Sequence, residues 1–422
     1  MKFSKLLLAM AASGIASSAF ATNGYFAHGY GMTAKGMGGA ATAMTKDAFG
    51  GANNPATMVW AGNRYDVGAD AFSPIREAGR AGGASGGDYA PQITSGTSGS
   101  DNELFGIPEF GYNKMLNDKM SVGVTVYGNG GMNTDYATNG SYNMLNGTTA
   151  LGVDLMQLLV APTVSYKVND KTSVGASALL GFQRFSASGL QFFAGFTTSG
   201  TTRNLTDIGY DDATGVGARI GIQHKLSDRV SLGAAYASKV DMSKFDKYSE
   251  LFAEQGDFDI PANWNVGIAF QPNDKLTVAV DFQHIAYSDV KSIANSSKNS
   301  GSLGTNDGRG FGWSDMDIAK LGVEYKYNPQ MTLRFGYSHA DSPIQARDVT
   351  FNMLAPGVIE DHVTVGMTYA LDKDSELTVS YAHALENSLS GASLLTDFGA
   401  TGGTETIKMH QNSIGIAYSK KF

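Results

Sequence analysis

Few residues in this chain combine the types and spacing that covalent chemistry requires. Gly83-Ala84-Ser85-Gly86-Gly87 fits the G-x-S-x-G pattern of serine hydrolases. Such a serine works only on a sharp strand-to-helix turn beside an oxyanion hole, whereas this one lies in a Gly- and Ser-rich stretch that predicts a loop. We therefore predict that the protein is not an enzyme.

Metal, cofactor and nucleic-acid chemistry also lack support. The seven histidines are dispersed, none belongs to an H-E-x-x-H pair, and the chain has no cysteine. The segment Gly29-Tyr30-Gly31-Met32-Thr33-Ala34 weakly resembles a dinucleotide fingerprint, but no strand precedes it. The 31 basic and 39 acidic residues are scattered and give a net charge of −8. We expect no metal, no cofactor and no nucleic-acid partner.

The elements that would position any site are marked by a recurring polar turn. Such turns begin at six positions about 50 residues apart, a spacing that holds two strands of about 10 residues and a long loop: Asn117, Asn169, Ser227, Asn273, Asn328 and Asp372. Each turn ends one strand-like run and opens another. The repeating unit is therefore a hairpin with alternately short and long connections.

After each turn, apolar residues alternate with polar ones. Leu333 and Phe335 alternate with Thr332 and Arg334, and the same period of two recurs in residues 276–283. Adding the strand pairs before the first turn and after the last gives seven hairpins. We predict an all-β fold: a transmembrane antiparallel barrel of 14 strands over residues 63–422. A secreted soluble β-protein is the alternative, because alternating Gly-rich strands also build sandwiches.

The two ends of the chain predict its location. Residues 1–21 have a basic start, an apolar run and a small-residue end, as in a signal peptide cut before Thr22. The apolar run is far shorter than the ~20 residues of a membrane-spanning helix. The last strand-like run ends at Phe422 and resembles the signal read by the outer-membrane assembly machinery, although Lys420 departs from the usual aromatic-rich ending. We predict a Gram-negative outer membrane, with its lipid and lipopolysaccharide and that machinery as partners.

Residues 22–62 lack the strand pattern. Glycines crowd residues 29–39, and small residues follow them. Dense Gly and Ala permit close backbone packing, so a compact segment before the first strand can fold back into a barrel. We predict that residues 22–62 form a plug, or hatch, with a short helix near residues 40–46.

Several segments carry a resemblance to a known family. Asn54-Pro55-Ala56, following the Gly-rich segment, resembles the hatch of the FadL/TodX-type family of outer-membrane transporters for long-chain fatty acids and other hydrophobic compounds. Residues 105–112, 245–264 and 273–288 resemble its second strand, its fourth outer loop entering the eighth strand, and its ninth strand. Taken alone, the tripeptide could be an ordinary turn.

The resemblance implies a function and an assembly. A monomer would take up long-chain fatty acids by passive, gated diffusion through the plugged barrel and release them sideways. Uptake of aromatic or aliphatic hydrocarbons by the same mechanism is the first alternative, because that family has such a branch. An outer-membrane enzyme or adhesin on a barrel scaffold is the second.

The resemblance also assigns a gate and a lateral opening. The gate would be the mobile start of the hatch: Thr22, Asn23, Gly24, Tyr25 and Phe26. Lateral release would use an inward kink in the third strand, at about residues 120–128. Gly123 and the following Gly128, Gly130 and Gly131 could permit the kink, with Gly123 and Gly128 as the main candidates, since glycine favours bends in strands. They could equally be ordinary strand and loop glycines.

Two predicted outer loops are unusually apolar. Apolar surface in water costs roughly 25 cal/mol per Å². Clustered side chains of this kind therefore indicate either a capture groove, which we favour, or mutual packing. They are Leu190, Phe192, Phe193 and Phe196 in one loop and Phe245, Leu251, Phe252 and Phe258 in the next.

A fatty acid would need a partner for its carboxylate, because burying an unpaired charge costs several kcal/mol. Strand parity places Arg219 and Arg334 on the lumen side as candidates. They could instead neutralise lumen carboxylates such as Asp281 and Glu324. A hydrocarbon would need neither arginine.

Overall fold

The computed structural model describes residues 23–82, 95–137, 147–398 and 402–422. In this part of the chain, fourteen long strands form one antiparallel barrel, closed by the pairing of the first strand with the last. They are β1 (Arg64–Ala81), β3 (Phe105–Asn117), β4 (Met120–Tyr136), β5 (Leu151–Lys167), β6 (Thr172–Ser188), β7 (Asp211–Ser227), β8 (Val230–Ala237), β10 (Asn263–Asn273), β11 (Leu276–Ile285), β12 (Met316–Lys326), β13 (Met331–Ala340), β14 (Asp361–Ala370), β15 (Ser375–Ala392) and β16 (Thr404–Lys421). Two short strands, β2 (Gly96–Gly99) and β9 (Asp241–Met242), pair with β1 and β7. The predicted 14-stranded barrel is confirmed.

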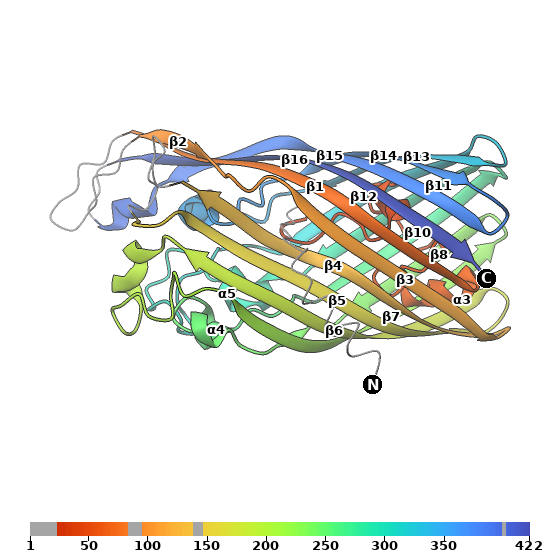
Figure 1. Cartoon of the computed structure of the whole chain (residues 1–422), viewed down its shortest axis with the longest axis horizontal. Helices are drawn as coiled ribbons and strands as arrows, with labels where there is room; N and C mark the ends of the chain where they lie inside the picture. The colour runs from red at the N-terminus through yellow and green to blue at the C-terminus, as the bar shows by residue number, and fades with distance from the viewer. Residues whose placement is uncertain (1–22, 83–94, 138–146, 399–401) are drawn as a thin grey trace.

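All six predicted turns join neighbouring strands. At five of them the first Asn or Asp side chain accepts a hydrogen bond from the backbone N–H two residues later, as Asn117 does from Lys119 at 2.9 Å. Ser227 does the same from Arg229 at 3.2 Å. These short side chains replace backbone partners in tight turns, which fixes the hairpin ends. The short turns lie at one end of the barrel and the long loops at the other (Figure 1).

The two faces of the wall differ as the alternation predicts. Phe335 is 48% exposed on the outside, whereas its neighbour Arg334 is 8% exposed and points inward. Apolar side chains thus cover the outer face, where lipid would replace water. Among the described residues, no helix is both long and apolar enough to cross a membrane.

Residues 23–62 lie inside the barrel (Figure 1). They hold α2 (Met32–Lys35), η1 (Pro55–Thr57) and α3 (Met58–Ala61). The helix expected near residues 40–46 was wrong: that stretch is irregular, because the N–H groups of Ala41 and Thr42 donate to the Asp281 carboxylate of β11 instead. The remaining short helices lie in the outer loops: η2 (Gln191–Phe196), η3 (Asp246–Tyr248), α4 (Ala253–Gly256), η4 (Tyr287–Asp289), α5 (Lys291–Ala294), η5 (Ala346–Asp348), α6 (Val349–Asn352) and η6 (Leu394–Phe398).

Candidate functional site

The third barrel strand, β4, carries an irregularity at its middle. Its register with β5 shifts between Gly128 and Gly130, so that Asn129 is an extra residue, a β-bulge. Its pairing with β3 ends at Val126, opposite Phe110, although β4 continues to Tyr136 and β3 begins at Phe105. Among the described residues, β4 therefore has no strand pairing with β3 from residue 127 to residue 136.

The start of the hatch bonds to this bulge. Residues 23–30, here called the gate segment, reach β4 where Phe26 bridges Gly130. The N–H of Ala27 donates to the Asn129 carbonyl at 3.1 Å, and the N–H of Gly131 donates to the Tyr25 carbonyl at 3.1 Å. Of the predicted gate residues, Tyr25 and Phe26 contact β4 at the bulge, Asn23 bonds to Phe26, and Thr22 lies outside the described residues.

The glycines of β4 have different roles. Gly123 pairs in regular register with Asn113 and Thr163, so it makes no kink. A side chain there would collide with the Tyr112 carbonyl of β3 and meet the sulfur-bound methyl group of Met58 at 2.6 Å, so close packing against β3 and the hatch accounts for it. Gly128 borders the bulge, and a side chain on Gly130 would collide with the Tyr25 carbonyl. The bend is at residues 128–130, so two of the glycines considered from the sequence, Gly128 and Gly130, flank it.

Aromatic rings surround the gate segment. The Tyr25 ring lies 5.2 Å from that of Tyr287, 6.0 Å from that of Trp313 and 6.2 Å from that of Phe258, between centroids. The Tyr287 hydroxyl donates to the Asn23 carbonyl at 2.5 Å and accepts from the Tyr25 N–H at 3.1 Å. Such ring contacts each contribute about 1 kcal/mol beyond area burial and can be exchanged for others.

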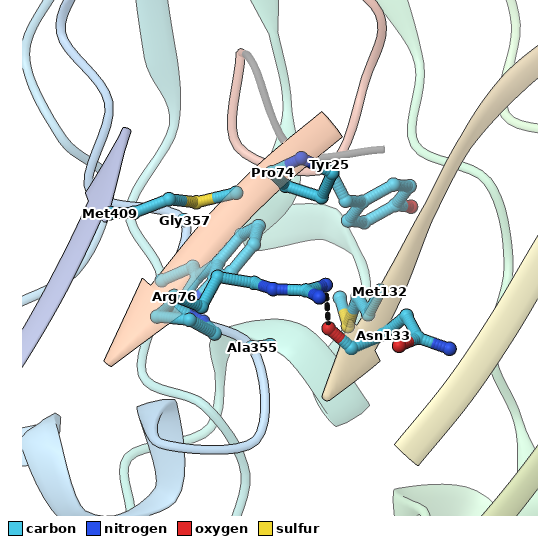
Figure 2. A pocket seen from close by; sticks show the side chains of 10 residues that line it. Tyr25, Pro74, Arg76, Met132, Asn133, Ala355, Gly357 and Met409 are labelled. Atoms are coloured by element: carbon cyan, nitrogen blue, oxygen red, sulfur yellow. Dashed lines mark hydrogen bonds between the residues drawn. The ribbon is translucent and has the colours of Figure 1, made fainter. Parts of the chain in front are cut away.

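A small apolar cavity lies next to these rings. Its wall includes Tyr25 of the gate segment, Pro74 of β1, Met132 of β4, Trp313, and Met409 of β16. Arg76 of β1, 2% exposed, also lines it and points its guanidinium toward the backbone of Asn133 (Figure 2). The cavity therefore joins apolar side chains from several strands to one buried cation.

In the described part of the chain, no carboxylate pairs directly with the Arg76 guanidinium, which lies 5.7 Å from the centre of the Phe105 ring. One terminal nitrogen donates to the Asn133 carbonyl, but Nε and the other terminal nitrogen have no partner among the described residues. Within the same residues, no carboxylate lies within 4.0 Å of it. An unpaired buried cation is costly, so this site favours an anion that occupies the cavity.

The two predicted arginines lie elsewhere. Arg334 pairs with Glu324 at 2.9 Å and donates to Thr368, and Lys46 of the hatch shares Glu324 at 2.7 Å. Arg334 thus has the charge-neutralising contact that the sequence left open as an alternative. Arg219 lines a separate polar cavity with Asp281 and Lys320. Neither arginine lines the apolar cavity beside the gate.

Asn54, Pro55 and Ala56 lie at the other end of the hatch from the gate segment. The Asn54 amide donates to the Thr42 carbonyl at 2.8 Å and to the Ile222 carbonyl of β7 at 3.0 Å. The Ala56 carbonyl accepts from the hydroxyls of Ser165 and Ser173, at 3.1 and 2.7 Å. These residues fix the hatch to the barrel wall.

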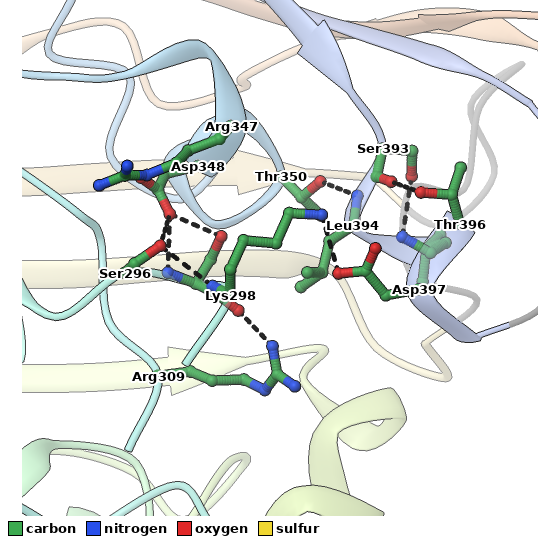
Figure 3. Close-up of polar contacts among 12 residues, drawn as sticks. Ser296, Lys298, Arg309, Arg347, Asp348, Thr350, Ser393, Leu394, Thr396 and Asp397 are labelled. Carbon is green, nitrogen blue, oxygen red and sulfur yellow. Dashed lines mark hydrogen bonds and ion pairs between the residues drawn. The ribbon is translucent and has the colours of Figure 1, made fainter. Parts of the chain in front are cut away.

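The apolar loop residues mostly pack against one another. Phe245, Phe252 and Phe258 are at most 4% exposed, and the Phe252 and Phe258 rings are 4.8 Å apart. Leu190 and Phe193 are also buried, while Phe192, Phe196 and Leu251 keep partial exposure. The outer ends of further loops are tied by polar contacts, such as the ion pair of Lys298 with Asp397 at 2.8 Å (Figure 3). The loops therefore form a packed cap above the gate segment.

A closed outer-membrane-type barrel with an internal plug, a bulged third strand and an apolar cavity defines a transport protein rather than an open pore. Comparisons with known proteins name the family. The profile of the family described as "Outer membrane protein transport protein (OMPP1/FadL/TodX)" matches residues 8–396. The chain belongs to this family, whose members are outer-membrane barrels of Gram-negative bacteria.

Individual relatives are distant but extensive. The long-chain fatty acid transport protein of Escherichia coli is 23% identical over 322 residues, which cover 66% of this chain and 70% of that protein. A Pseudomonas aeruginosa FadL homologue superposes with a TM-score of 0.71 at 17% identity, covering 94% of this chain and all of that one. The toluene transporter TodX of Pseudomonas putida gives 0.68 at 22% identity, with 94% and 99% covered. These two structures share the fold.

Sequence reasoning missed Arg76 and the amide side chains near the bulge. A usable signal existed for Arg76: Arg64, Asp66, Asp70 and Arg76 share one parity of β1 and so face the lumen together. Which of them lacks a partner depends on other strands, and no local pattern reveals that.

Proposed function

We propose that this protein takes up long-chain fatty acids by passive diffusion through the outer membrane, gated by residues 23–30 and released sideways at the β4 bulge. The observation that carries the proposal is Arg76, a buried guanidinium with two unpaired nitrogens in an apolar cavity. A carboxylate would satisfy both nitrogens, since arginine and carboxylate match in two parallel hydrogen bonds. The acyl chain would lie against Met132, Trp313 and Met409.

The gate is the next step on this route. Tyr25 lines the cavity and also bonds to Gly131 of β4, so a ligand that displaces Tyr25 would loosen the contact at the bulge. Beyond Val126, the described part of β4 does not pair with β3, which supports an exit between these two strands. In this proposal residues 22–62 act as a hatch whose first residues move, while Asn54, Pro55 and Ala56 stay anchored.

The test compares two ligands in a bacterium that lacks its own transporter and expresses this chain. Arg76→Met should lower uptake of labelled oleate by roughly 10- to 100-fold, the size of a lost charged hydrogen-bond pair. Toluene uptake should stay within about twofold, because toluene has no charge to pair. Arg229→Met, at an exposed turn, is the matched control.

The hydrocarbon alternative has its own support. The cavity wall is mainly apolar, and the toluene transporter TodX shares the fold. If toluene enters efficiently and oleate does not, with the barrel assembled, the fatty-acid proposal fails. Arg219 and Arg334 stay as candidates from the sequence. Measured in parallel, Arg219→Met separates the contribution of Arg219 to oleate uptake from that of Arg76.

A further inference from the structure

Three buried amide side chains on the neighbouring strands β4, β5 and β6 form one continuous chain of hydrogen bonds. Asn129 of the bulge donates to Gln157 of β5 at 3.0 Å, and Gln157 donates to Gln183 of β6 at 3.0 Å. Gln183 then donates to the backbone carbonyl of Phe258 at 2.7 Å. All three amides are at most 3% exposed. We call Asn129, Gln157 and Gln183 the amide chain.

Each end of the amide chain meets a part of the proposed transport route. At one end, Asn129 accepts from the Tyr30 hydroxyl at 3.2 Å and, through its carbonyl, from the Ala27 N–H at 3.1 Å. At the other end, Phe258 belongs to the packed cap, and its ring lies 6.2 Å from that of Tyr25. Phe258 therefore contacts the gate segment by its ring, and its carbonyl is linked to the bulge through Gln183 and Gln157.

The loop that holds Phe258 carries backbone strain. Glu254 and Gln255 have φ values of 56° and 61°, and Gly256 has φ of 103°, so three successive residues are left-handed. Left-handed conformations are costly for residues with side chains, and such strain gathers in segments that switch between states. The loop is held in this form by its packing, which includes the ring contact of Phe258 with Phe252 at 4.8 Å.

The three hydrogen bonds run in one direction, each amide donating to the next acceptor. If the Phe258 carbonyl moved away, the Gln183 amide would lose its acceptor in a buried site, where an unpaired polar group is strongly disfavoured. Reorientation of Gln183 would then disturb Gln157 and Asn129 in turn. A displacement of Phe258 would therefore change the hydrogen bonding of Asn129 at the bulge.

We propose that Asn129, Gln157 and Gln183 are positioning residues that couple the outer loop at Phe258 to the β4 bulge and the gate segment. This inference rests on the proposed function: a hydrophobic ligand entering beneath the cap shifts Phe258, and the amide chain transmits the shift to Asn129. Gate opening then follows ligand arrival rather than random fluctuation of the gate segment alone.

The test uses the absence of cysteine in this chain. In the purified full-length barrel carrying Ala27→Cys, the rate of maleimide labelling reports gate opening. Added oleate should raise that rate about fivefold, a typical coupling factor. With Gln183→Met or Gln157→Met, oleate should no longer raise the labelling rate. The affinity for oleate, measured separately by equilibrium dialysis, should stay within about twofold of the parent barrel. In cells, the same variants should lower the maximal uptake rate and leave KM unchanged.

The control is Gln411→Met, which removes a buried lumen amide whose described side-chain contact is only to the sulfur of Met409. This variant should keep the fivefold rise. Retention of the rise in Gln183→Met, or loss in Gln183→Met but not in Gln157→Met, would overturn the amide chain as a coupling device. If neither oleate nor toluene changes labelling or binds to the parent barrel, the proposed function itself fails. Heat-modified electrophoretic mobility confirms that each variant is a folded barrel.

Discussion

The two ends of the hatch are held by different kinds of contact. Residues 31–61, here called the base, are fixed to the wall by charged groups: Lys35 pairs with Asp70 at 2.7 Å, and Lys46 pairs with Glu324 at 2.7 Å. The gate segment, residues 23–30, is held by ring packing, by a few hydrogen bonds to neutral groups and by one hydrogen bond from the Lys320 ammonium to the His28 carbonyl at 3.2 Å. No ion pair of its side chains occurs among the described residues.

This difference is consistent with a base that stays anchored and a gate segment that moves. Breaking a buried ion pair leaves an uncompensated charge and costs about 3 to 5 kcal/mol, so the base has no cheap alternative position. A ring contact costs about 1 kcal/mol and can be replaced by contact with an apolar ligand. The contrast supports the proposal that the hatch opens at the gate segment while the base stays in the barrel.

The strongest test removes one charge from the base. Lys35→Met leaves the carboxylates of Asp70 and Glu109, 2.7 and 3.8 Å from Lys35 Nζ, buried without their cation. We expect the free energy of unfolding to fall by about 3 to 5 kcal/mol. Denaturant unfolding in detergent micelles measures this, and entry of a hydrophilic antibiotic reports whether the plug still fills the barrel.

Lys373→Met is the control for the base, because the Lys373 side chain is 90% exposed at a turn. We expect its unfolding to match the parent barrel, since exposed pairs contribute little. Equal stability of Lys35→Met and the control would show that the base is not anchored by charge. It would contradict the proposed difference between the base and the gate segment.

A smaller effect is expected at the gate segment. Tyr287→Phe keeps the ring beside Tyr25 but removes the hydroxyl that bonds to Asn23 and Tyr25. Losing two hydrogen bonds in a buried site costs about 1 to 2 kcal/mol, which corresponds to roughly 5- to 30-fold more frequent opening. Maleimide labelling of Ala27→Cys measures it.

Tyr248→Phe is the matched control, because the Tyr248 hydroxyl bonds to the Gly209 carbonyl and to the Ala187 N–H of β6 and, among the described residues, makes no hydrogen bond to the gate segment. Global unfolding of both variants should differ little. Faster labelling in the control than in Tyr287→Phe would place the restraint in the cap rather than in the gate segment.

The fold was readable from the sequence because its signals are local. Each short turn needs only one Asn, Asp or Ser, and each strand face needs only a period of two, so turns such as Asn117 and inward side chains such as Arg334 were predicted correctly. The helix expected at residues 40–46 failed for the opposite reason. Asp281, more than 200 residues away, captures the N–H groups of Ala41 and Thr42.

The candidate site was only partly readable. The gate residues beside β4 came from a family resemblance, whereas the cavity joins β1, β4, β16 and the outer loops, and its unpaired Arg76 is defined by what other strands do not supply. The amide chain has the same character. Gln157 and Gln183 stand opposite each other only through the register of β5 with β6, which no local pattern in either strand specifies.

The smallest expected effect is a pH dependence of the cap beside the gate. Burial, followed by repulsion from Asp259 and Glu254, raises the pKa of Asp257 from 3.8 to about 6. A raised carboxyl pKa means that the packed loop binds its proton more tightly than the opened loop. The stability of the packed loop is therefore highest below about pH 4, decreases as the pH rises to about 6, and is constant above that. Protease cleavage of the loop should be slower at about pH 5 than at about pH 7.5, and Asp257→Asn should remove the difference while leaving the base unchanged. If Asp257→Asn kept the pH dependence of cleavage, another titrating group would be responsible, and Asp257 would have no role in the stability of the cap.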